Sequence, residues 1–89
     1  MKEFATMTEY VMYSFGVSHG KESRRLRDKF MAGWTDGWDI PSLQASVALG
    51  KTKALQREVA EQMGGQAAVD AYDAGVQHGF QGEEEVSMS

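Results

Sequence analysis

Apolar residues recur at helical spacing along most of this chain, and capping signals divide them into segments. Thr6 and Glu9 form a capping box, which predicts that a first helix covers residues 7–19. Leu26, Phe30 and Trp34 recur every four residues, which predicts a second helix over residues 22–38. We expect it to end before Pro41, because the residue before a proline disfavours the α region.

Two further helices follow from the same pattern. Pro41 suits the first turn of a helix over residues 41–63, and Gly64-Gly65 is expected to end it. The apolar residues expected to face inward on this helix are Leu43, Val47, Leu55, Val59 and Met63. A last helix is predicted over residues 66–80. We therefore predict an all-α fold, a compact bundle of about four helices in one domain (1–80), followed by a flexible acidic tail (81–89).

An eight-residue pattern occurs twice in full. Residues 13–20 read Tyr-Ser-Phe-Gly-Val-Ser-His-Gly and residues 72–79 read Tyr-Asp-Ala-Gly-Val-Gln-His-Gly; residues 30–37 carry a looser copy, with Asp36 at the histidine position. Glycines four apart lie on one helix face, and each costs about 0.5–1 kcal/mol relative to alanine. This cost indicates close Gly-x-x-x-Gly packing between helices. The alternative is that some of these glycines are helix C-caps, with Gly20 as the best candidate.

These repeated segments resemble those in small early proteins of tailed bacteriophages. The resemblance implies a small cytoplasmic helical protein that binds and inhibits a host component, such as a defence or transcription protein. It transfers no binding residue, because the pattern marks helix packing.

Composition narrows the classes of function. The 89 residues, 42% of them apolar and 25% charged, suit one folded domain, and the chain has no cysteine for a disulfide or thiolate site. A net charge of −4 has the wrong sign for a dedicated phosphate-backbone binder. The first residues show no signal-peptide pattern and no stretch is long and apolar enough to span a membrane, so we expect a cytoplasmic protein.

The residues that could carry chemistry are few. His19 and His78 share one repeat position with Asp36, and two histidines with a carboxylate can bind a metal. In an up-down bundle, however, the first and fourth helices run antiparallel, which would place the two histidines at opposite ends. Gly50-Lys51-Thr52 lacks the earlier glycine of a phosphate-binding loop. We predict no metal, no cofactor and no enzymatic activity.

The leading hypothesis is a non-enzymatic protein-binding module, with a host protein as partner and self-association into a homo-oligomer. Tryptophan and arginine dominate interface hot spots, and the second predicted helix is rich in both. The predicted contact residues are Arg24, Arg25, Arg27, Trp34 and Trp38. The alternative for the tryptophans is that they form the core of the bundle.

The competing hypothesis is that the chain binds nucleic acid or a nucleotide through its basic clusters. A second cluster adds Lys51, Lys53 and Arg57 to the arginines of the second predicted helix. Binding of this kind would weaken steeply with added salt.

Overall fold

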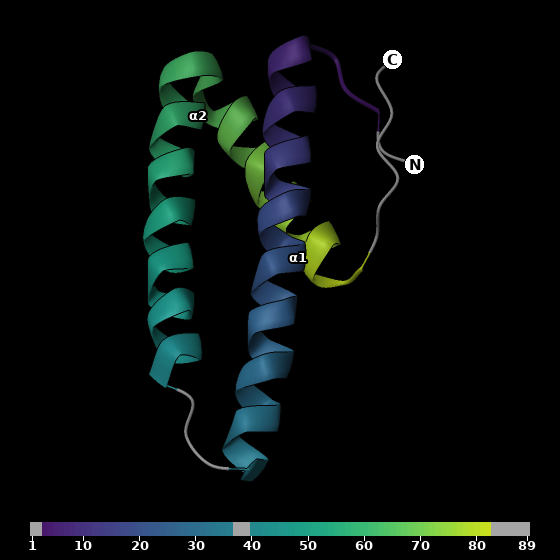
Figure 1. Cartoon of the computed structure of the whole chain (residues 1–89). Helices are drawn as coiled ribbons and strands as arrows, with labels where there is room; N and C mark the ends of the chain where they lie inside the picture. Colours follow the sequence, from purple (N-terminus) through teal and green to yellow (C-terminus); the bar gives the residue numbers. More distant parts are fainter. Residues whose placement is uncertain (1–2, 37–39, 83–89) are drawn as a thin grey trace.

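In the computed structural model, the residues whose placement is described form two helices, α1 (Met7–Asp36) and α2 (Ile40–Phe80) (Figure 1). The structure describes residues 3–36 and 40–82, and within them the side chains of all but 30, 33–36 and 40–43. The all-α class is confirmed. The four-helix bundle is wrong: the first two predicted helices are a single helix, and the last two are the limbs of one kinked helix, here called the long limb (40–64) and the short limb (66–80).

The first helix does not stop where the sequence suggested. Gly20 lies in the middle of α1 and packs against Gly79 of the short limb, so it serves helix packing and not capping. The basic and acidic residues that follow are favourable helix formers and continue the helix. The start of α1 is as predicted: the backbone N–H of Glu9 donates to Thr6 Oγ1 (3.2 Å), and Glu9 Oε2 accepts from the N–H of Ala5 (3.1 Å).

Gly65 is the point at which α2 changes direction. Its backbone angles, φ 66° and ψ −151°, fall in a region that is essentially restricted to glycine. The predicted break at Gly64-Gly65 is therefore confirmed as a kink. Because the long limb runs back along α1 and the kink reverses the chain again, the short limb runs in the same sense as α1 (Figure 1).

The buried core occupies one half of the molecule. Phe4 packs its ring against Tyr10 and Tyr13, with ring centroids 5.7 and 4.8 Å apart. Among the side chains that the structure describes, the buried apolar residues come from 4–17 and 60–72: Phe4, Met12, Tyr13, Val17, Ala60, Ala68, Val69, Ala71 and Tyr72. The chain extends 46 × 26 × 12 Å, and its smallest dimension is close to the diameter of one helix. In the part of the chain that the structure describes, the outer faces of α1 and the long limb consequently have no second layer of helices over them.

Candidate interaction surfaces

The two full copies of the repeat pack directly against each other. A Cβ built on Gly16 would lie 2.9 Å from the Cα of Gly75, and one built on Gly20 would lie 2.9 Å from the Cα of Gly79. Real Cβ atoms do not approach other atoms so closely, so the two backbones touch where side chains are missing. Close packing through Gly-x-x-x-Gly is confirmed for these two copies. The glycines of the looser copy lie outside the described side chains.

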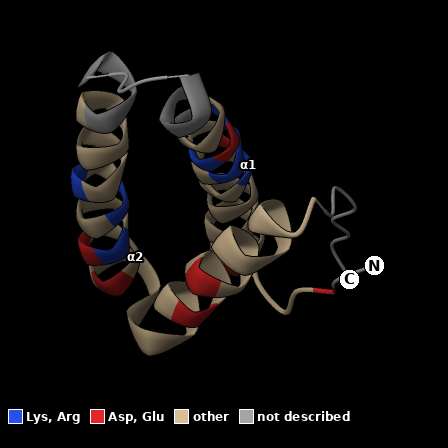
Figure 2. Ribbon diagram, turned by 90° about the horizontal axis from the view of Figure 1, so that it is seen from below, with Lys and Arg blue, Asp and Glu red and all other residues tan. Residues whose placement is uncertain are grey.

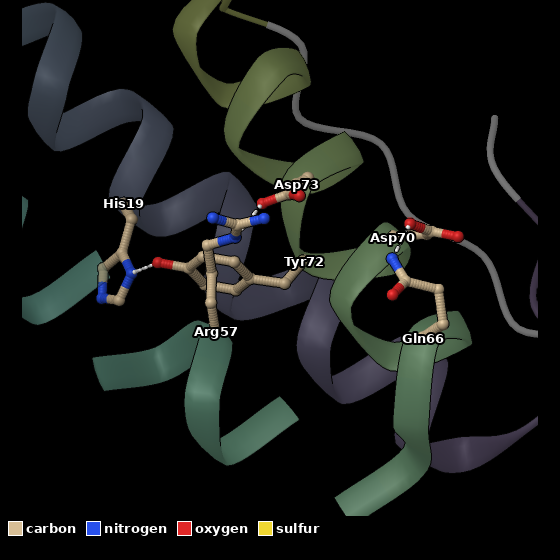
Figure 3. Close-up of polar contacts among 6 residues, drawn as sticks. All are labelled: His19, Arg57, Gln66, Asp70, Tyr72 and Asp73. Carbon is tan, nitrogen blue, oxygen red and sulfur yellow. Dashed lines mark hydrogen bonds and ion pairs between the residues drawn. The ribbon is translucent and has the colours of Figure 1, made fainter. Parts of the chain in front are cut away.

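The packed copies are related by an approximate twofold axis, because their equivalent glycines face each other and their tyrosine and histidine rings form two matching pairs. The rings of Tyr13 and His78 lie 5.4 Å apart, and those of His19 and Tyr72 lie 5.6 Å apart. His19 Nδ1 is hydrogen-bonded to the Tyr72 hydroxyl (Figure 3). The antiparallel arrangement expected for the first and last helices is wrong: the kink makes them parallel, so both histidines lie at the same interface.

The electrostatics of this interface favour neutral groups. Burial, and after it the nearby positive charge of Lys53, lowers the pKa of His19. Burial, with the Asp73 carboxylate, raises the pKa of Tyr72 to about 12, against an opposing effect of Arg57. A neutral imidazole and a neutral phenol suit a structural hydrogen bond. Among the side chains that the structure describes, no three of the metal-ligating type cluster, and the Asp36 side chain is not among them.

The predicted arginine cluster is divided between two sides of α1. Arg27 places its guanidinium 4.6 Å from the centre of the Phe80 ring and 3.2 Å from the Asp28 carboxylate. Arg24 lies over Gly82, at the end of the short limb. Arg25 lies about 100° around the helix from Arg24. Its side chain is 73% exposed and forms a loose ion pair with Glu22 at 3.8 Å. Trp34 lies in α1 but outside the described side chains, and Trp38 lies outside the described residues.

The second basic cluster is divided as well. Arg57 Nε forms an ion pair with Asp73 of the short limb at 3.1 Å (Figure 3). Lys53 is half-buried toward α1, close enough to affect His19, whereas Lys51 is exposed on another side of the long limb. Acidic residues lie among the basic ones on both helices (Figure 2). The structure does not bring these three cations together into one basic surface.

Between α1 and the long limb lies an open cleft of about 330 Å³ that the sequence did not predict. Leu26 and Leu49 face it together with Arg27 and Lys53. The cleft lies between α1 and the long limb, a pair whose described residues form no glycine interface like the one between α1 and the short limb.

A shallow apolar groove runs along the outer side of α1, again without a sequence prediction. We call it the α1 groove; its volume is about 250 Å³ and its lining residues are Tyr10, Val11, Ser14, Phe15 and Ser18. Phe15 is 45% exposed although it is aromatic and lies inside the repeat. Its side chain points away from the glycine face, since Gly16 occupies the contact.

The long limb also carries an uncovered apolar face. The prediction that Val47, Leu55 and Met63 point into a core is wrong: they are 54%, 56% and 57% exposed. The side that does face α1 includes Ala60, which is buried, and Gly64, whose backbone lies near the Thr8 side chain. We call the uncovered side the outer α2 face, made of Ala45, Ala48, Thr52, Leu55, Val59 and Met63.

Comparison of the chain with protein-family models, with curated proteins and with solved structures finds no match. Within the part of the chain that the structure describes, neither helix contains a stretch apolar enough and long enough to cross a membrane.

Proposed function

We propose that this chain is a non-enzymatic protein-binding module that acts by occupying a partner protein. The observation that carries the proposal is the α1 groove, an apolar depression with an exposed aromatic side chain on a helix. Apolar and aromatic side chains form the energetic centre of protein interfaces. A groove of this size accommodates one or two apolar side chains of a partner segment.

The groove lies on the closely packed part of α1. It is formed by residues 10–18 of α1, and the opposite side of the same turns packs against the short limb through Gly16 and Gly75. A surface held in its binding conformation loses little conformational entropy on association. This arrangement supports recognition by a preformed surface.

Charge along α1 extends the proposed surface beyond the groove. Arg25 and Lys29 are exposed on turns that follow the groove, whereas Arg24 and Arg27 contact the end of the short limb. We therefore assign partner contact to Arg25 ahead of the other two arginines; contact through Trp34 and Trp38 stays a prediction. That the partner is a host protein comes from the resemblance to phage proteins alone.

Capture from a bacterial lysate tests the proposal if matched variants are compared. Phe15→Asp places a charge in the α1 groove, and Val47→Asp makes the same kind of change at a somewhat more exposed site outside it (54% against 45%). We expect the unmodified chain and Val47→Asp to retain one protein in near-stoichiometric amount after nuclease treatment. Phe15→Asp should retain at least about tenfold less, as expected for loss of a hot spot.

Two outcomes would contradict the proposal. Material lost on nuclease treatment would favour nucleic-acid binding, and equal retention by both variants would remove the groove as the site. Circular dichroism of both variants checks that the helices are intact.

A further inference from the structure

We propose that the outer α2 face is the contact surface for a second copy of this chain, paired antiparallel along the long limb. The inference goes beyond partner binding, because it uses a different helix and a different side of the molecule. Figure 1 shows the long limb at one edge of the molecule, with α1 on one side and no other helix beyond it.

The spacing of the outer α2 face is that of a two-helix seam. Ala45, Ala48, Thr52, Leu55 and Val59 follow one another at intervals of three and four residues, the a and d positions of a heptad. All are exposed except the half-buried Val59. The small alanines permit close approach of a second helix, and Met63 lies at the edge of the seam.

Thr52 is the one hydroxyl residue in this seam, and its hydrogen bond is made within the helix. Its Oγ1 donates to the carbonyl oxygen of Ala48 (3.1 Å). The hydroxyl is thereby satisfied without water, and the methyl group remains for an apolar contact. If a second helix covers the seam, the Thr52 hydroxyl therefore keeps its hydrogen-bond acceptor.

Two opposite charges on one flank of the seam set the direction of pairing. Lys51 and Glu58 are seven residues apart, and both are exposed beside the seam. Among the described residues, neither takes part in an ion pair. In an antiparallel pair with Thr52 opposite Leu55 of the second copy, Lys51 of each copy lies opposite Glu58 of the other. The charges are therefore self-complementary.

A parallel pairing does not use these charges. In that arrangement Lys51 would face Gln56 of the second copy and Glu58 would face Met63, so neither would gain an ion pair. Exposed ion pairs add little affinity but discriminate between alternative pairings. The flanking charges thus favour the antiparallel dimer, which would present two α1 grooves to a partner.

Sedimentation equilibrium of the full chain, from about 1 µM to about 1 mM, tests the contact. The unmodified chain should show a reversible monomer–dimer equilibrium in this range. Leu55→Glu should weaken it at least about tenfold, whereas Val47→Glu, equally exposed but beside the seam, should leave it within about twofold.

Charge exchange then tests the direction. Lys51→Glu and Glu58→Lys each place like charges opposite each other, and each should weaken the homodimer by about fivefold. The two single variants mixed together should pair with each other preferentially, and the double variant should recover the original dissociation constant. The antiparallel contact is overturned if the chain stays monomeric over this range, or if the mixed variants show no preference.

These readouts are separate from the test of the α1 groove. If the chain does not self-associate, retention of a partner protein through the α1 groove is unaffected. If partner retention is lost, the dissociation constant of the dimer is unaffected.

Discussion

The molecule consists of two halves that use similar residues differently. The near half comprises residues 4–20 and 60–80, and it contains every buried apolar residue named above. The far half comprises residues 21–36 and 40–59, and none of its described side chains is buried. The far half is not poor in apolar residues, since Leu26, Leu49 and Leu55 lie there. The two halves differ because only the near half contains the glycine interface, where two backbones touch and the side chains around them pack together.

This difference implies that stability is concentrated in the near half and that surfaces available for contact are spread over the molecule. A glycine in the near half carries a packing function, whereas Gly50 in the far half has nothing within 4 Å of the position of a Cβ. Substituting glycine by alanine should therefore lower the free energy of unfolding in the near half and raise it in the far half.

The largest expected effect comes from alanine at the interface. Gly16→Ala or Gly75→Ala would place a methyl group 2.9 Å from the opposing Cα, and backbone cannot move aside as a flexible side chain can. We expect each to lower the free energy of unfolding by about 3 kcal/mol, even after the gain in helix propensity. Urea denaturation followed by circular dichroism measures this.

The matched control is Gly50→Ala in the far half. It should raise the free energy of unfolding by about 0.5–1 kcal/mol, because only helix propensity changes. Equal effects of all three substitutions would mean that the repeat copies are not in contact.

The contrast between the halves explains which features of the packing could be predicted from the sequence. The glycine spacing predicted close packing at residues 16 and 20 and at 75 and 79, because it depends on one helix face alone. That the first copy packs parallel to the last was not predictable from spacing, since it depends on the angle at Gly65. Gly20 followed by Lys21 and Glu22 fits a C-cap and a helix interior equally well, and only the partner Gly79 decides between them.

The candidate surfaces were harder to predict for a related reason. Periodicity showed that the long limb has an apolar stripe, but it does not say what covers the stripe; Leu55 was assigned to a core and is exposed. The arginines are neighbours in sequence, yet Arg25 and Arg27 point to different sides of α1. The exposure of Phe15 was not predicted, although Phe15 directly precedes Gly16 and therefore lies off the packed face of the helix.

A second test of the near half is to strain the kink that places the short limb against α1. Gly65→Ala forces an L side chain into φ 66° and ψ −151°, and we expect it to cost about 1–3 kcal/mol. D-Alanine at position 65, introduced by chemical ligation, adds the same methyl group in a backbone region that a D residue favours. It should retain most of the stability, which thermal unfolding would show. Equal losses for both residues would attribute the cost to lack of space.

The smallest expected effect is the pH dependence of the near half. The pKa of His19 is lowered in the folded state, so the unfolded chain binds more protons below about pH 6.5 and stability falls as the pH falls through that range. The pKa of Tyr72 is raised from 10.0 to about 12, so its contribution is present below pH 10 and declines above it, by about 1 kcal/mol at pH 11. Chemical denaturation at several pH values should thus show a plateau between these limits. Tyr72→Phe should remove the alkaline decline, whereas Tyr10→Phe, at a partly exposed ring outside the glycine interface, should retain it. A decline that persists unchanged in Tyr72→Phe would show that the alkaline limb belongs to other groups and not to the hydroxyl bonded to His19.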